Sequence, residues 1–344
     1  MAESIETLGE FGLIDRIAKQ TTTQQPTTLK GIGDDCAVLS QSEGMVKVVT
    51  TDLLLEGIHF DLTYCPLKHL GYKAVAVNLS DVCAMNAYPR QITVSIGVSG
   101  KFTLKAIDDL YDGIRLACQR YGVDLVGGDT TSSLTGLTIS ITAIGEQKPS
   151  RLAYRNGARP NDILCVSGDL GAAYAGLQLL EREKRVLKGN NSASPALDGY
   201  KYILERQLKP EPRPDIVDFL EKIDVVPTSM MDVSDGLSSE LIHICSQSEV
   251  GCRLYEDRVP LHAETKALCA ELNINPIVAA LNGGEDYELL FSIRQEDYPK
   301  FQSQPGPEIY AIGYVCEKEK GRRMITTGGD EADLQAQGWR FFTN

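Results

Sequence analysis

Apolar positions along the chain repeat with two different periods, and together they predict alternating helices and strands. A period of about 3.6 residues predicts helices over residues 6–18, 71–85 and 104–121. A period of two, or a short apolar run between turn residues, predicts strands over 45–51, 91–98, 123–126 and 137–144. This alternation favours an α/β (α+β) class.

The second half of the chain begins near Arg151 and continues the alternation. Strands are predicted over 163–166, 229–233, 287–293 and 309–315, with helices after Gly168–Gly171 and from Leu237. Residues 181–197 mix charges with Gly, Asn and Ser and predict a solvated, mobile insert, while the prolines of 209–214 predict a rigid extended stretch. The length of 344 residues suits two domains. We expect them at 1–150 and 151–344.

Composition excludes several classes of protein. Hydrophobic residues make up 42% and charged residues 24%, as in a soluble globular enzyme. The formal charge of −13 argues against a nucleic-acid partner and an anionic membrane surface. Nine cysteines without a CxxC pair predict reduced, buried thiols. With neither a signal-peptide pattern nor an apolar run of about 20 residues, we expect a cytoplasmic protein with no membrane partner.

Several aspartates directly follow β-rich apolar runs and stand beside Gly, Ser or Thr. Ligands gather beyond the carboxyl ends of strands in α/β sheets, so these carboxylates are expected to face one another. Such a cluster requires cations, and Asp together with Ser or Thr oxygens suits Mg²⁺ better than Zn²⁺. The aspartates concerned are Asp34, Asp35, Asp52, Asp129, Asp232 and Asp235.

Turn and helix-cap chemistry is the alternative explanation for each aspartate taken singly, and for Asp35 it is the favoured one. The repeated placement after strands favours the metal interpretation for the set. The sequence contains neither the GxxxxGK[ST] phosphate loop nor a dinucleotide-binding GxGxxG after a strand. ATP would therefore be bound through metals and backbone amides, with help from bases such as Arg155.

Eight motifs in order resemble the thiamine-monophosphate kinase family, within the superfamily of aminoimidazole ribonucleotide synthetase, selenophosphate synthetase and the hydrogenase-maturation dehydratase. They run from residue 31 to residue 339 and so cover nearly the whole chain. The matching segments are GIGDD at 31–35, TTDLLLEGIHF at 50–60, NLSD at 78–81, GGD at 127–129, RNGA at 155–158, MDVSDG at 231–236, GGEDYE at 283–288 and GW at 338–339.

The resemblance implies two α/β domains, the N-terminal one forming a β-barrel with its copy in a homodimer. It also implies ATP-dependent phosphorylation of thiamine monophosphate to thiamine diphosphate with several Mg²⁺ ions. The implied metal positions are Asp34, Thr50, Thr51, Asp52, Asp81, Asp129, Asp232 and Asp235. The implied ATP contacts are Tyr111, Gly128, Asp129, Arg155 and Ser234, and the implied substrate contacts are His59, Glu285 and Trp339.

The chemistry of this reaction matches the residue types in the motifs. The acceptor is a phosphate with a second pKa near 6, largely ionised at pH 7, so no general base is required. Charge neutralisation and positioning then dominate, and direct in-line transfer is expected. The cationic thiazolium ring suits Glu285 and an aromatic face such as Trp339, although Trp339, His59 and Tyr111 are also plausible packing residues. Two alternatives are another ATP-dependent phosphotransferase of the superfamily and a non-catalytic divalent-cation-binding protein.

Overall fold

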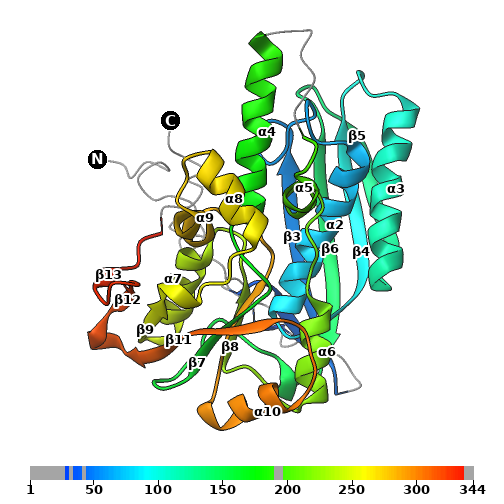
Figure 1. The fold of residues 1–344 in the computed structure, drawn as a ribbon. Helices are drawn as coiled ribbons and strands as arrows, with labels where there is room; N and C mark the ends of the chain where they lie inside the picture. Colours follow the sequence, from blue (N-terminus) through cyan, green and yellow to red (C-terminus); the bar gives the residue numbers. More distant parts are fainter. Residues whose placement is uncertain (1–27, 31–33, 41–43, 190–196, 337–344) are drawn as a thin grey trace, which may run out of the picture.

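A computed structural model describes residues 28–30, 34–40, 44–189 and 197–336 (Figure 1). The helix predicted over 6–18 and the candidate residue Trp339 lie outside these ranges. The first half of the chain forms a six-stranded sheet in the order β1-β2-β3-β6-β4-β5, in which only β4 and β5 are parallel. Its strands are β1 (Thr28–Lys30), β2 (Ala37–Ser40), β3 (Val46–Leu55), β4 (Tyr88–Val98), β5 (Asp124–Ser132) and β6 (Thr138–Gln147).

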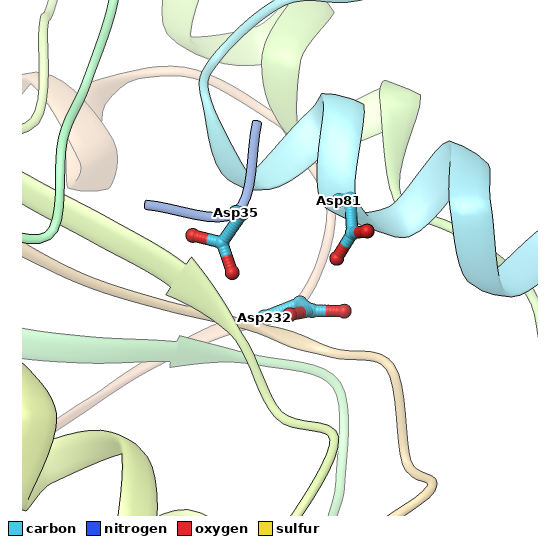
Figure 2. Close-up of side chains that lie close together, drawn as sticks. All are labelled: Asp35, Asp81 and Asp232. Atoms are coloured by element: carbon cyan, nitrogen blue, oxygen red, sulfur yellow. The ribbon is translucent and has the colours of Figure 1, made fainter. Parts of the chain in front are cut away.

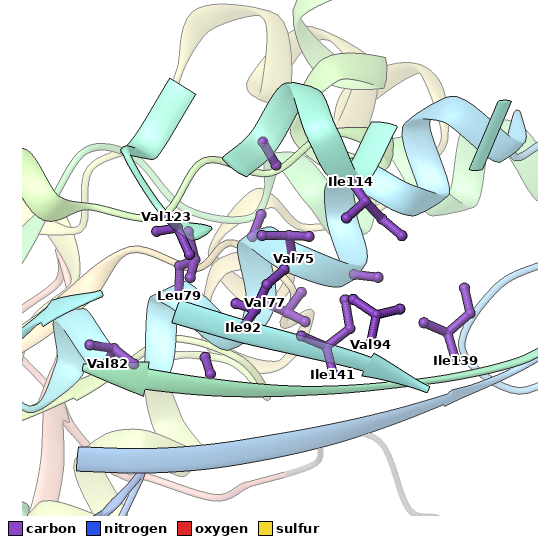
Figure 3. Close-up of a cluster of buried hydrophobic side chains, with 14 of the residues drawn as sticks. Val75, Val77, Leu79, Val82, Ile92, Val94, Ile114, Val123, Ile139 and Ile141 are labelled. Carbon is purple, nitrogen blue, oxygen red and sulfur yellow. The ribbon is translucent and has the colours of Figure 1, made fainter. Parts of the chain in front are cut away.

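Two long helices, α2 (Leu67–Ala84) and α3 (Leu104–Tyr121), cover one face of this sheet. Alternate residues of β6 are buried beneath them, as the period of two predicts. Figure 3 shows these aliphatic side chains meeting those of α2. Each such side chain stabilises the fold by about 1.5–3 kcal/mol. The sheet and α2 thus form one rigid core.

The second half of the chain forms a seven-stranded sheet in the order β13-β12-β9-β11-β7-β10-β8, antiparallel except for the β9–β12 pair. Its strands are β7 (Ile163–Ser167), β8 (Ser229–Asp232), β9 (Val250–Tyr255), β10 (Leu289–Ile293), β11 (Ile309–Glu317), β12 (Arg322–Ile325) and β13 (Glu331–Asp333). Its helices are α4 (Ala172–Gly189), α5 (Lys201–Leu208), α6 (Pro214–Lys222), α7 (Leu237–Ser248), α8 (Ala263–Glu271), α9 (Pro276–Asn282) and α10 (Tyr298–Ser303). Short 3₁₀ turns lie at η1 (Pro149–Arg151), η2 (Glu256–Arg258), η3 (Gln295–Asp297) and η4 (Lys318–Lys320).

The C-terminal end of α2 joins the two sheets. Cys83 and Ala84 belong to the same buried cluster as Cys165, Met230 and Phe291 of the second sheet. Polar residues one turn earlier on α2 therefore lie against strand β8, and this contact places them in the site described below.

The predicted elements are largely confirmed as a mixed α/β arrangement, and three of the differences are informative. β3 and β5 extend well beyond the predicted strands, because their polar residues do not end them. The mobile insert predicted over 181–197 is wrong for residues 181–189, which continue α4. The extended stretch predicted over 209–214 ends one residue early, because Pro214 takes the first position of α6, where its missing N–H is not needed.

Two sequence expectations about the chain's surroundings can be compared with the structure. All nine cysteines are buried free thiols, as expected. Among the residues that the structure describes, we find no helix with both the length and the apolar character of a membrane span.

Candidate active site

Three carboxylates from distant parts of the chain meet where the two sheets join (Figure 2). Asp35 lies in a bend before β2, Asp81 lies near the end of α2, and Asp232 is the last residue of β8. One oxygen from each lies within 4.8 Å of the others. Like charges this close repel one another, so the cluster requires positive charge nearby.

Hydroxyl and guanidinium groups hold the three carboxylates in place. Thr50 Oγ1 donates to Asp81 Oδ2 over 2.5 Å, and Ser80 Oγ donates to Asp232 Oδ2 over 2.6 Å. The Arg155 guanidinium makes two hydrogen bonds to Asp35, of 2.5 and 3.1 Å. The cluster is therefore ordered by contacts with both halves of the chain.

Burial gives these carboxyl groups unusual proton affinities. It raises the pKa of Asp232 to about 7 and that of Asp52 to about 6. Burial also raises the pKa of Asp81 well above its usual value, and the neighbouring charges of Asp52 and Asp232 raise it further. A bound cation would favour the ionised forms. Because the donors are carboxylate and hydroxyl oxygens alone, the site fits Mg²⁺.

A cavity of about 480 Å³ adjoins the cluster. Ser234 and Asp235, which follow Asp232 in the chain, line it together with Glu285 and Tyr287. Burial raises the pKa of the Tyr287 hydroxyl, and the charges of Glu285, Asp52 and Asp232 raise it further. The charges of carboxylates in both the cavity and the cluster therefore act on the Tyr287 hydroxyl.

Residues 283–288 form one wall of the cavity, and two of them have a backbone conformation that residues other than glycine rarely adopt. Glu285 and Tyr287 have φ angles of 58° and 52°, in the left-handed region. Their N–H groups donate to Ser234 O and Val233 O over 2.7 and 2.9 Å. These hydrogen bonds hold Glu285 beside the Ser234–Asp235 loop. Strain of this kind is often found at functional sites.

A buried lysine and a histidine complete this wall. Lys73 Nζ, on α2, lies 2.9 Å from Glu285 Oε1, and Gln207 Nε2 donates to Glu285 Oε2 over 2.8 Å. His59 Nδ1 accepts a hydrogen bond from the Leu55 N–H over 3.0 Å. Burial lowers the pKa of His59, which favours the neutral ring, and because Nδ1 accepts a hydrogen bond the proton of that neutral ring is on Nε2. The cavity thus offers anionic, cationic and neutral polar groups.

Comparison with known proteins identifies the chain's relatives. Residues 33–147 match the family model described as AIR synthase related protein, N-terminal domain. The chain is 34% identical to the thiamine-monophosphate kinase of Bacillus subtilis over 97% of its own length and all of that protein, and 34% identical to the Aquifex aeolicus kinase over 98% and 99%. It belongs to the thiamine-monophosphate kinase family.

Solved structures agree with this assignment. The structure of AaThiL complexed with AMPPCP and TMP matches with a TM-score of 0.82 at 32% identity, covering 99% of this chain and all of that one. The hydrogenase maturation protein HypE matches at 21% identity with a TM-score of 0.66, covering 87% of this chain and 91% of HypE, which shows a shared fold alone.

Within the motif at 31–35, the structure places Asp35 and not Asp34 in the carboxylate cluster. Asp35, for which turn chemistry was favoured, lies in the cluster, whereas Asp34 Oδ2 lies 2.9 Å from Lys30 Nζ and its Oδ1 accepts from the Arg155 N–H over 2.9 Å. Consecutive side chains in the bend point in different directions. Asp34 therefore stays a predicted metal ligand, with its side chain paired to Lys30 instead of lying in this cluster.

The family's second motif is also divided between two surfaces. Thr50 and Asp52 share one face of β3, because side chains alternate along a strand. Thr51 points to the opposite, exposed face, where its Oγ1 donates to Ile141 O over 3.0 Å. Asp52 also lies inside β3 rather than at its end, contrary to the expected placement. The expectation was based on parallel sheets, whereas this sheet is mostly antiparallel.

Two further predicted positions lie on the other edge of the first sheet. Asp129 is exposed in the middle of β5, and its Oδ1 accepts from the Thr130 N–H over 2.8 Å. Three inter-strand spacings separate β5 from β3, which is roughly 14 Å. Gly128 precedes Asp129 on β5, and a Cβ at Gly128 would clash with the Val94 carbonyl. Within one chain, neither residue lies with the cluster.

The remaining predicted residues have mixed locations. Arg155 and Ser234 lie at the site, as do the substrate-side positions His59 and Glu285. Tyr111 packs on α3 against the buried core of the first sheet.

Sequence reasoning missed Lys73, Gln207 and Ser80. Ser80 and Lys73 are seven residues apart on α2, which places them on one helix face, and that spacing is the signal that would have linked Lys73 to the site.

Proposed function

We propose that this chain transfers the γ-phosphoryl group of ATP to thiamine monophosphate, producing thiamine diphosphate and ADP, at the carboxylate cluster and the adjoining cavity. The observation that carries the proposal is the meeting of Asp35, Asp81 and Asp232 beside a cavity with charged side chains in its wall, in a member of the thiamine-monophosphate kinase family. A relative of that family has been solved with AMPPCP and TMP, which are an ATP analogue and a phosphate ester.

The chain's own oxygens are suited to hold divalent metal. We propose Asp81, Asp232 and Asp52 as principal ligands, with Thr50 and Asp35 beside them. Bound Mg²⁺ would neutralise the charge that two polyanionic substrates bring together. Asp34, Thr51, Asp129 and Asp235 remain predicted ligands. Of these, Thr51 and Asp129 face away from the cluster, so a role for them requires a second copy of the chain.

The cavity residues account for recognition of the acceptor. Its phosphate is ionised at neutral pH and attacks without a general base. The neutral His59 ring can donate a hydrogen bond from Nε2 to a phosphate oxygen. Glu285 and Asp235 supply negative charge for the thiazolium ring, which carries a fixed positive charge. We keep Arg155, Ser234, Gly128 and Tyr111 as proposed ATP contacts and Trp339 as a proposed substrate contact.

We also propose a homodimer formed through the first sheet, each chain having domains near 1–150 and 151–344. One face of this sheet is covered by α2 and α3, while Leu53 of β3 and Leu125 and Val126 of β5 are exposed. A β-barrel between two copies would bury these apolar side chains.

The test of the proposed function is a coupled assay of ADP release with chromatographic detection of thiamine diphosphate. We expect ADP release that depends on thiamine monophosphate and Mg²⁺, with one thiamine diphosphate formed per ADP. ADP release without thiamine diphosphate would indicate another phosphotransferase. No ADP release at all would favour the non-catalytic cation-binding protein. A trapped phosphoenzyme would contradict direct transfer.

A further inference from the structure

One wall of the cavity contains a cation supplied by the protein itself. Lys184 Nζ, on α4, lies 2.6 Å from Asp61 Oδ2 and 3.1 Å from Glu181 Oε1. It also lies 5.6 Å from the centre of the Tyr64 ring. All four residues line the cavity that contains Glu285 and Asp235. Two carboxylates and an aromatic ring around an ammonium group form a binding position for a positive charge.

The cavity contains a second ion pair of the same kind, and the two differ in how readily the lysine can leave. The Lys73 side chain, paired with Glu285, is only 5% exposed and also donates to Gln207 O over 3.2 Å. The Lys184 side chain is 19% exposed, and those of Asp61 and Glu181 are 26% and 35% exposed. A long, solvent-accessible lysine can move into water at little cost, whereas a buried one cannot.

We propose that Lys184 is a specificity-determining residue that occupies the cation position of the substrate cavity in the free protein and leaves it when a cationic ring binds. The proposal rests on the proposed function, because thiamine monophosphate carries such a ring. The exchange replaces one positive charge with another, so Asp61 and Glu181 keep one positive charge beside them throughout. A neutral ring of the same shape forms no ion pair with these carboxylates, so no new interaction offsets its displacement of the ammonium.

The proposal predicts opposite effects for the two partners of one ion pair. Lys184→Met removes the competing cation and leaves Asp61 and Glu181 open to substrate. We expect the KM for thiamine monophosphate to fall about three- to fivefold, the range of exposed ion pairs and cation–π contacts. Asp61→Asn removes an acceptor of the cation and should raise the same KM by a similar factor. The KM for ATP should stay unchanged in both variants.

A substrate without the charge separates recognition of the cation from a change in the shape of the cavity. The probe is deazathiamine monophosphate, in which a neutral thiophene ring replaces the thiazolium. Its KM should not rise in Asp61→Asn, because a neutral ring makes no ion pair with that carboxylate. Lys184→Arg keeps the cation and should resemble the unmodified protein. Lys266→Met, an exposed lysine of α8 outside the cavity, is the matched control.

The outcomes decide between recognition and a purely structural ion pair. A structural pair predicts that Lys184→Met and Asp61→Asn change the KM in the same direction and equally for both substrates, which would overturn the proposal. An unchanged KM in Lys184→Met with active protein would also overturn it and leave the proposed function intact. A wild-type protein that fails to phosphorylate thiamine monophosphate would overturn both.

Discussion

Asp232 has two opposing effects, one on the stability of the metal-free protein and one on catalysis. Burial raises the pKa of Asp232 to about 7, so above that pH the buried, ionised carboxylate destabilises the folded protein. Metal-free Asp232→Asn should therefore melt at the same or a higher temperature than wild type at pH 8. This difference should shrink as the pH falls from 7 towards 4, because Asp232 becomes protonated in the folded state. Scanning calorimetry with EDTA measures it.

The same substitution should reduce turnover by about 100-fold or more at saturating Mg²⁺, since it removes a carboxylate proposed to hold the metal. Asp81→Asn should behave alike. Asp333→Asn, on the exposed strand β13, is the matched control and should keep full activity. Near-normal turnover of Asp232→Asn would remove Asp232 from the metal site.

Lys73 should control the protonation of His59. Burial lowers the pKa of His59 and the Lys73 charge lowers it further, whereas Glu285 raises it. Lys73→Met removes a positive charge and leaves Glu285, so the His59 pKa should rise. NMR titration of the histidine ring measures this shift, and His59→Gln identifies the signal. Lys73→Arg should restore the wild-type value; an unchanged pKa in Lys73→Met would show that the lysine charge does not reach the ring.

At the scale of elements, the position of Asp81 depends on how closely α2 and α3 pack. A Cβ at Gly113 of α3 would strike the Lys68 carbonyl of α2, and a Cβ at Gly71 would strike the Leu110 carbonyl of α3. Backbone carbonyls cannot rotate away as side chains do, so the helices must separate. Gly113→Ala should lower the free energy of unfolding by about 2 kcal/mol or more. Guanidinium unfolding measures it.

Gly100→Ala provides the control for this glycine. Its Cβ would have nothing within 4 Å among the described residues. It should leave stability nearly unchanged. Equal stability of Gly113→Ala and wild type would mean that α2 and α3 do not pack this closely.

The sequence predicts best those elements whose pattern of apolar residues depends on packing alone. Helix 104–121 has an uninterrupted apolar stripe, and the structure gives the same bounds for α3. The end of β3 was misplaced because Thr50, Thr51 and Asp52 interrupt the apolar run. Two of these residues face the site, so the sequence there reflects chemistry as well as burial.

At the scale of the whole molecule, site residues that depend on contacts between distant segments escape sequence reasoning. Asp35 beside a turn looks the same whether it caps the backbone or faces Asp81 and Asp232. The sequence around Lys73 does not indicate that it pairs with Glu285, because this pairing depends on how α2 meets the second half of the chain. The ordered motifs predicted the family and four of the residues that line the cavity, His59, Ser234, Asp235 and Glu285, since the motifs follow the chain rather than the fold.

The proposed dimer makes a prediction at this scale too. Val126 is 58% exposed on β5, and an aspartate there would place charge in the proposed interface. Val126→Asp should sediment as a monomer of about 37.6 kDa and the wild type as a species of twice that mass. Leu104 of α3 is 78% exposed, outside the proposed interface, and Leu104→Asp should remain dimeric. A monomeric wild type at micromolar concentration would contradict the interface.

The central claim is that the carboxylates at the junction of the two sheets hold the divalent metal between ATP and thiamine monophosphate. The most direct test is anomalous X-ray scattering from crystals grown with Mn²⁺, AMPPCP and thiamine monophosphate. We predict anomalous peaks within coordination distance of Asp81 and Asp232 oxygens and of the nucleotide phosphates. Peaks confined to other parts of the chain, with both substrates bound and these carboxylates unliganded, would contradict the account.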